Sequence, residues 1–283
     1  MMLPTESDQR RFADLLQRRA GLSLPVASLP LAGARLTPRL DRLGLDSFAA
    51  YLALLEEGDE LPMALDLLTT QEACFFREPE QFELLESELS RQRPVRLRLW
   101  SAGAGTGDDA YSLAMLLGDL QRAGRLGADW SVLGTDISEP RLQAAKAALY
   151  AQARLRLVSA QRRQRYCLGG EGAAGLVQMQ AGLRERVRFE RLDLRQALPA
   201  GEPFDVILLR HLLVYFDAAT RRAIVARVLA RLRPGGLFAV GAAEARLFDP
   251  DGLEPLMPGL FRKGRQQPAR RSASAALVAP MPR

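Results

Sequence analysis

Apolar residues recur every three or four positions through the first ninety residues, a spacing that predicts amphipathic helices. We expect helices over Asp8–Ala20, Leu36–Leu43, Ser47–Leu55, Leu61–Leu68 and Pro79–Leu89. Thr37 and Pro38 form a good helix start, because threonine caps a helix and proline fits its first turn. Arg91–Pro94 is typical of a linker. The pattern therefore predicts an all-helical domain over residues 1–90.

From Val95 onward, short apolar runs alternate with helical patterns. The expected strands are Arg96–Ser101, Trp130–Thr135, Val187–Leu192, Phe204–Leu209 and Leu237–Gly241, and the expected helices are Ala110–Ala123, Glu139–Ala148 and Thr220–Leu232. This alternation predicts an α/β domain over residues 95–262, with helices on both faces of a parallel sheet. The alternation lapses between Tyr150 and Gly182, where we expect a small β-subdomain inserted at about residues 153–182.

The composition is that of a globular protein, with 48% hydrophobic and 25% charged residues. The chain has no apolar run of 18 residues and no signal-peptide pattern at its start, so we expect a cytoplasmic location. Cys74 and Cys167 show neither metal nor redox spacing and are expected to be reduced thiols. His211 is the one histidine of the chain, so no metal site is expected.

The net charge of +6 comes from the end of the chain. Residues 262–283 hold six basic residues and no acidic residue, so residues 1–261 have no formal net charge. The segment 263–283 is rich in Pro, Ala, Ser and Arg, which predicts a disordered basic tail. Because the basicity belongs to this tail, no nucleic-acid partner is expected.

A strand-like run ending at Ala102 leads into three alternate glycines, Gly103, Gly105 and Gly107, and then into a helical pattern. Glycines allow a sharp turn, and they let a ligand lie against bare backbone at a helix N-terminus. The spacing is G-x-G-x-G and differs from the dinucleotide fingerprint G-x-G-x-x-G, whose last glycine lets the helix approach a pyrophosphate. A cofactor without a pyrophosphate fits better, and S-adenosylmethionine is the obvious one.

Polar residues follow three of the expected strands, where ligands of open α/β sheets bind. Asp136 can accept hydrogen bonds from a ribose diol, or it can simply cap the next helix. Asp193 can meet an adenine amino group while the Leu194 backbone N–H meets a ring nitrogen, or the two can form an ordinary loop turn. Arg210 and His211 follow a third strand, and His211 is either a substrate-facing group or a loop histidine.

Five segments together resemble the CheR-type chemotaxis receptor methyltransferases. They are Thr69–Arg77, Trp100–Ser112, Thr135–Ile137, Arg210–Phe216 and Leu232–Gly236. The resemblance implies a Rossmann-like class I methyltransferase domain with a small β-subdomain, preceded by a helical domain that carries a basic helix. It also implies methyl transfer from S-adenosylmethionine to glutamate side chains of a chemoreceptor's cytoplasmic helical bundle, with S-adenosylhomocysteine as the product.

The resemblance also implies roles for individual residues. Cofactor contacts fall on Gln71, Ala73, Arg77, Gly103, Gly105, Asp109, Asp136, Asp193, Leu194, Arg210 and His211. Arg77 would lie near the methionine end of the cofactor and Tyr215 beside the methyl group, as catalytic residues. Arg35, Arg39 and Arg42 would bind an acidic receptor helix. The alternatives are a helix-surface arginine at 77, a core tyrosine at 215 and a merely solvated basic face.

The chain departs from the family's motifs at several cofactor and cleft positions, among them Gln71, Ala73, Asp109 and His211 in place of Asn, Thr, Glu and Asn. The family's Glu-Glu-Pro is Asp108–Ala110 here, and its closing Gly-His-Ser-Glu is Gly241–Glu244, with alanine at 242 and 243. We therefore hold three hypotheses of function. The first is a monomeric protein-glutamate O-methyltransferase acting on a chemoreceptor. The second is a weak or inactive relative that serves as a regulatory scaffold for a receptor or another signalling protein. The third is a Rossmann-type methyltransferase with a different substrate.

Overall fold

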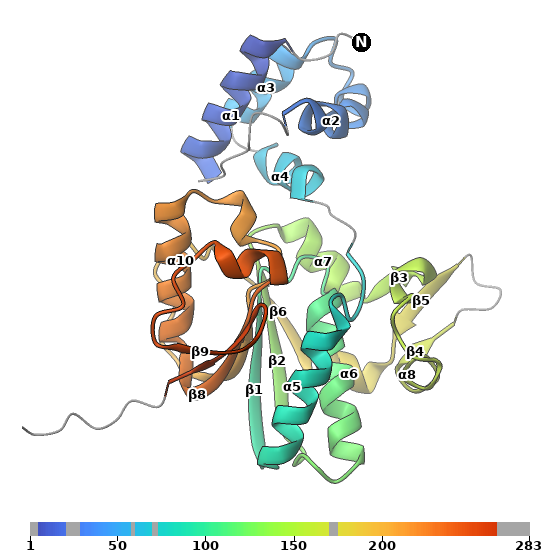
Figure 1. Cartoon of the computed structure of the whole chain (residues 1–283). Coiled ribbons are helices and arrows are strands. Elements are labelled where there is room, and N and C mark those ends of the chain that lie inside the picture. Colours follow the sequence, from blue (N-terminus) through green and yellow to red (C-terminus); the bar gives the residue numbers. More distant parts are fainter. Residues whose placement is uncertain (1–4, 21–28, 58–59, 70–72, 170–174, 265–283) are drawn as a thin grey trace, which may run out of the picture.

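The computed structural model describes residues 5–20, 29–57, 60–69, 73–169 and 175–264. The chain begins with the helices α1 (Glu6–Ala20), α2 (Leu29–Leu43), α3 (Phe48–Glu57) and α4 (Leu61–Thr69), which form a separate layer at one end of a sheet (Figure 1). Among the described residues, no helix has the length and apolar character needed to cross a bilayer.

Helix α2 starts earlier than the sequence predicts, so the expected helix start at Thr37 and Pro38 is wrong. Pro38 lies inside α2. Ala32, Leu36 and Leu40 are buried at four-residue spacing, and this continuous apolar face keeps the helix intact through the proline. The Thr37 hydroxyl donates to the Gly33 carbonyl at 3.1 Å, a bond that is common where helices bend.

A seven-stranded mixed sheet follows in the described part of the chain, in the order β6-β2-β1-β7-β8-β10-β9. Its strands are β1 (Arg96–Ala102), β2 (Asp129–Asp136), β6 (Val187–Arg191), β7 (Phe204–Leu208), β8 (Leu232–Ala239), β9 (Leu253–Met257) and β10 (Leu260–Lys263). Its helices are α5 (Pro79–Gln92), α6 (Asp108–Arg122), α7 (Glu139–Ala147) and α10 (Ala218–Ala230), with the short α9 (Ala181–Arg184) leading into β6.

The first five strands in this order are parallel, as predicted, whereas β10 and β9 add an antiparallel edge that the sequence analysis missed. These two strands are short and show no clear alternation, and Pro255 lies within β9. Two boundaries also differ. Strand β8 begins at Leu232, where a helix end is predicted, and Lys263 belongs to β10 and not to the tail.

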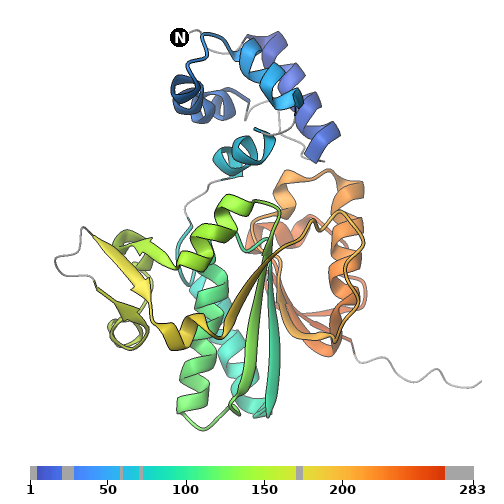
Figure 2. The same cartoon turned by 180° about the vertical axis from the view of Figure 1, so that it is seen from behind.

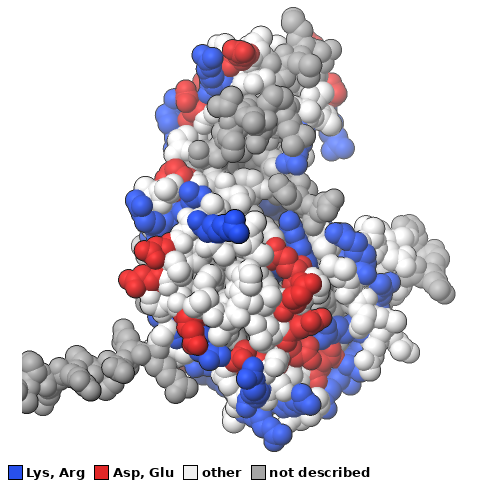
Figure 3. All heavy atoms as spheres, in the orientation of Figure 1, with Lys and Arg blue, Asp and Glu red and all other residues white. Residues whose placement is uncertain are grey.

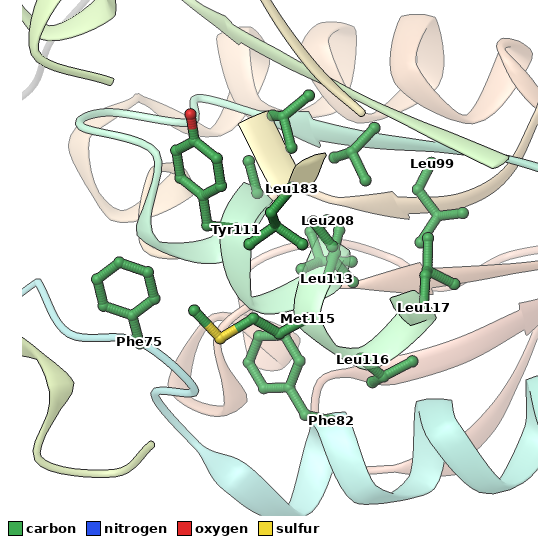
Figure 4. Packing of buried hydrophobic residues seen from close by; sticks show 14 of the residues in the cluster. Phe75, Phe82, Leu99, Tyr111, Leu113, Met115, Leu116, Leu117, Leu183 and Leu208 are labelled. Carbon is green, nitrogen blue, oxygen red and sulfur yellow. The ribbon is translucent and has the colours of Figure 1, made fainter. Parts of the chain in front are cut away.

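Both faces of the sheet are buried, and side chains alternate between two cores. On one face, Leu97 and Leu99 of β1 pack with residues of α5, α6 and α7 (Figure 4). On the other face, Trp100 packs with residues of α10, and the same cluster continues into the helices α1 to α4. Figure 2 shows the sheet from behind, with α10 and α7 on opposite sides of the strands.

An antiparallel three-stranded sheet projects from the side of the domain, as the lapse in alternation predicts (Figure 1). It comprises β3 (Leu149–Ala151), β4 (Cys167–Leu168) and β5 (Leu176–Met179), with the 3-10 helix η2 (Gln152–Leu155) and α8 (Ala160–Tyr166). We call residues 149–179 the inserted subdomain. Asp119 of α6 anchors it by accepting from Arg162 Nε at 2.7 Å and from the Tyr166 hydroxyl at 2.8 Å. Figure 3 shows the acidic side chains of α5 beside the basic side chains of this subdomain.

We expect Leu116→Ala to lower the free energy of unfolding by about 2–5 kcal/mol, because it leaves a cavity in a packed core. Leu116 of α6 is completely buried in the core that α5, α6 and α7 form on one face of the sheet (Figure 4). Denaturant unfolding measures the change. Val95→Ala is the matched control, since Val95 is 81% exposed and its truncation should change stability by no more than about 0.5 kcal/mol. Equal effects of the two substitutions would contradict the assigned core.

Candidate functional site

The loop between β1 and α6 is a tight turn of bare backbone. Gly103, Gly105 and Gly107 have φ angles of 75°, 53° and 93°, in the left-handed region that favours glycine. A Cβ added at Gly103 would lie 2.8 Å from Leu212 Cδ2, whereas one at Gly105 would meet nothing within 4 Å. Open space therefore lies over Gly105 at the N-terminus of α6, where backbone N–H groups can contact a ligand.

Asp136 at the end of β2 braces this glycine loop. Its Oδ2 accepts from the Gly105 backbone N–H at 2.9 Å, and its Oδ1 accepts from that of Ser138 at 2.9 Å. Ser138 itself is the N-cap of α7. Burial raises the pKa of Asp136, and these backbone hydrogen bonds oppose the shift. Because each carboxylate oxygen has a second lone pair, Asp136 can still accept from a ribose hydroxyl.

Asp193 lies after β6, and its carboxylate is engaged by Arg195, which donates to both oxygens. Although burial raises the pKa of Asp193, the side-chain and backbone hydrogen bonds from Arg195 lower it overall. Leu194 is buried. Asp136 thus ends β2 and Asp193 follows the neighbouring parallel strand β6, so both lie at the carboxyl ends of these strands.

Arg210 lies at the centre of a buried ion-pair network. Its Nη1 donates to Asp109 Oδ1 at 2.9 Å, and its Nη2 donates to Glu78 Oε2 at 3.2 Å and to the Arg77 carbonyl. The Arg210 side chain is only 1% exposed. The network therefore joins the end of β7 to the start of α6 and to the segment that carries Arg77.

Glu244 organises the loop that follows Arg210. Its carboxylate is buried and accepts backbone N–H groups from His211 at 2.6 Å, Gly241 at 2.9 Å and Val214 at 3.2 Å. Sequence reasoning did not identify Glu244 or Glu78 as site residues. The available signals were that Glu78 directly follows Arg77 and that Glu244 ends the closing motif Gly241–Glu244.

His211 holds a left-handed backbone conformation, with a φ of 58°. Its Nε2 is buried without a hydrogen-bond partner among the described residues and lies 3.8 Å from Glu78 Oε1. Burial lowers the pKa of His211 to about 4, and the nearby charges of Arg210 and Arg77 add to this shift. His211 is therefore neutral at physiological pH.

The positive charges of arginines from different parts of the chain affect the pKa of the Tyr215 hydroxyl. Tyr215 belongs to the 3-10 helix η3 (Leu213–Tyr215) and is 9% exposed. Burial raises its pKa and the negative charge of Glu244 adds to the rise, whereas the positive charges of Arg35, Arg141 and Arg77 oppose it. The structure thus brings Arg35 of the helical domain, Arg77 and Tyr215 into one electrostatic neighbourhood.

The predicted receptor-binding arginines do not form one free patch. Arg39 makes a bidentate ion pair with Glu60, at 2.7 and 2.9 Å, which Tyr51 joins by donating to Glu60 Oε1. Arg35 donates to the Leu68 carbonyl at 2.7 Å, whereas Arg42 is exposed.

Ala73 and Gln71, two of the predicted cofactor residues, belong to the segment between α4 and α5. Ala73 is exposed, and Gln71 falls outside the described residues. The predicted cofactor roles of both residues therefore stay predictions.

Family models match most of the chain. The CheR methyltransferase SAM binding domain matches residues 71–256, and the CheR methyltransferase all-alpha domain matches residues 7–69. A chemotaxis protein methyltransferase of Klebsiella aerogenes is 38% identical over 242 residues, which cover 83% of this chain and 82% of that protein. Those of Salmonella typhimurium and Escherichia coli are 35% and 36% identical and cover 83% of this chain and 82% and 83% of their own lengths. These matches confirm the resemblance inferred from the motifs.

We expect His211→Asn to lessen the loss of stability on acidification. The folded protein holds the pKa of His211 near 4, against 6.5 for an ordinary histidine. The unfolded chain therefore binds the proton first, so this contribution to stability is complete above about pH 6.5 and declines as the pH falls towards 4. Denaturant unfolding of both proteins at about pH 7.5 and pH 5 measures the difference. An identical decline in both would show that His211 does not titrate in this way.

Proposed function

The chain belongs to the CheR methyltransferase family, and from this premise we propose that it methylates glutamate side chains on the cytoplasmic helical bundle of a chemoreceptor, using S-adenosylmethionine. The observation that supports this proposal most strongly is that three parts of the chain meet at one edge of the sheet. They are the glycine loop, Asp136 and the loop from Arg210 to Tyr215. Ligands of open α/β sheets bind at this edge.

The residues at this edge fit the cofactor. The backbone at Gly105 faces open space, and Asp136 has lone pairs that can accept hydrogen bonds from a ribose. Asp193 and Leu194 follow β6, the strand that pairs with β2, and would contact the adenine. By the family resemblance, Arg77 would pair with the carboxylate at the methionine end of the cofactor. When bound, S-adenosylmethionine supplies a methyl group made electrophilic by the adjoining sulfonium charge.

The acceptor explains why no strong base is needed. A glutamate has an ordinary pKa near 4.3, so its carboxylate is already a nucleophile at neutral pH. The positive charges of Arg35, Arg141 and Arg77 near Tyr215 favour the approach of such an anion, and the buried carboxylate of Glu244 opposes it. Tyr215 beside the methyl group would align the attacking carboxylate oxygen, and Arg77 would hold the methionine end of the cofactor so that its methyl group faces that oxygen. Such alignment is the main contribution that this site has to make to the rate.

The departures from the family motifs left a non-catalytic scaffold as an alternative, and the names of the similar proteins do not favour it. The deciding experiment incubates the protein with tritiated S-adenosylmethionine and receptor-containing membranes. We expect label on the receptor that base releases as methanol, as a glutamyl methyl ester requires. Cofactor binding and receptor binding without any such label would overturn the proposal in favour of the scaffold.

We expect Arg77→Ala to slow methyl transfer about 100-fold and Tyr215→Phe about 10-fold, with receptor association nearly unchanged, because both residues act on alignment. Initial rates of tritium incorporation measure methyl transfer, and a receptor pull-down measures receptor association. Arg91→Ala is the matched control, since Arg91 is an exposed residue at the other end of α5. Loss of receptor binding in parallel with rate would contradict the catalytic assignment.

We expect Arg42→Glu to weaken receptor association several-fold at low salt, and we expect the effect to shrink as ionic strength rises, because exposed charges are screened. Arg42 is the suitable test residue because Arg39 is committed to Glu60. Arg18→Glu, at an exposed position of α1, gives the same charge change as a control. Equal effects of the two variants would indicate general charge repulsion and no specific surface on α2.

A further inference from the structure

The inserted subdomain contacts the glycine loop directly. Tyr150 of β3 is 2% exposed, and its hydroxyl donates to the Thr106 carbonyl at 2.7 Å. A Cβ added at Gly107 would lie 3.0 Å from the Tyr150 hydroxyl oxygen. The subdomain therefore forms one wall of the turn that precedes α6.

Arg154 of η2 makes a second and more polar contact with the same loop. Its Nη2 donates to Thr106 Oγ1 at 2.6 Å and to Asp108 Oδ2 at 2.5 Å. The Thr106 hydroxyl in turn donates to Asp108 Oδ2 at 2.9 Å. The guanidinium, hydroxyl and carboxylate thus form a closed triangle at the first residue of α6.

The main chain of Arg154 holds another part of the candidate site. Its carbonyl accepts from the Phe75 backbone N–H at 3.1 Å, and the Phe75 ring packs edge-on against Tyr150 with centroids 4.9 Å apart. Phe75 lies two residues before Arg77. One residue of the subdomain therefore connects the glycine loop to the segment that carries Arg77.

The ion pair between Arg154 and Asp108 stabilises a buried carboxylate. The Asp108 side chain is 9% exposed, and its Oδ1 has no hydrogen-bond partner among the described residues. Burial raises the pKa of Asp108, and the charge of Arg154 is the largest effect that opposes the rise. A buried carboxylate without its cation is strongly destabilising, so removal of Arg154 should displace Asp108 and the loop bonded to it.

We propose that Arg154 is a positioning residue that sets the shape of the cofactor-binding loop from the inserted subdomain. The proposal rests on the proposed function, because it assumes that the glycine loop holds S-adenosylmethionine. It assigns to the subdomain a part in cofactor affinity, through a contact that neither the family match nor the motifs indicate.

Calorimetry with S-adenosylhomocysteine tests the proposal on the full chain. Arg154→Met should weaken binding about tenfold or more, since it removes two hydrogen bonds of a charged group. Arg154→Lys keeps the charge and should recover part of the affinity. The KM for S-adenosylmethionine should rise by a similar factor while kcat at saturation stays within about threefold, because the loop acts on binding.

Arg163→Met is the matched control. Arg163 belongs to the same subdomain and donates to the Val158 carbonyl at 2.9 Å within it. Its loss should leave cofactor affinity within about twofold of wild type, the spread expected of a surface change. An equal loss of affinity in Arg163→Met would overturn the proposal, because it would show a general effect of loosening the subdomain.

Thr106→Val provides a second route should Arg154→Met fail to fold. It removes the hydroxyl between Arg154 and Asp108 without changing any charge, and we expect affinity to fall about threefold to tenfold. Unchanged affinity in the folded variants would overturn this proposal alone. Absence of binding in the wild type would overturn it together with the proposed function, so the two failures are distinguishable.

Discussion

The geometry of the candidate site depends on the buried guanidinium of Arg210. This residue follows β7, yet it binds Glu78 ahead of α5 and Asp109 at the start of α6, more than 100 residues away in the sequence. A buried cation is tolerated only when it is paired and hydrogen-bonded, so none of the three segments can shift independently. Arginine suits the position because its planar fork serves several acceptors at once.

A shared apolar core fixes the helical domain against this edge. Phe12 and Tyr51 of the helices belong to the same buried cluster as Trp100 and Phe238 of the sheet. The helices therefore cannot be treated as an independent attachment, because part of their core is the second face of the sheet. This shared burial is what brings the charge of Arg35 close enough to affect Tyr215.

The chemistry at the edge is electrostatic and needs little proton transfer. Burial and the charges of Arg210 and Arg77 lower the pKa of His211 to about 4, so near neutral pH His211 is not a cationic partner and is a weaker base than an ordinary histidine. A carboxylate acceptor needs no deprotonation there, and the surrounding arginines favour its approach. The absence of a Ser/His/Asp arrangement among the described residues is therefore consistent with transfer to an anionic oxygen.

The sequence by itself determined the alternation of strands and helices, the glycine turn and the motif segments, because periodicity and local turn chemistry are properties of neighbouring residues. The tertiary structure alone decided that α2 continues through Pro38, that Arg39 is paired with Glu60, and that Glu244 shapes the loop after Arg210. Each of these depends on residues distant along the chain, which only packing brings within hydrogen-bonding or van der Waals distance.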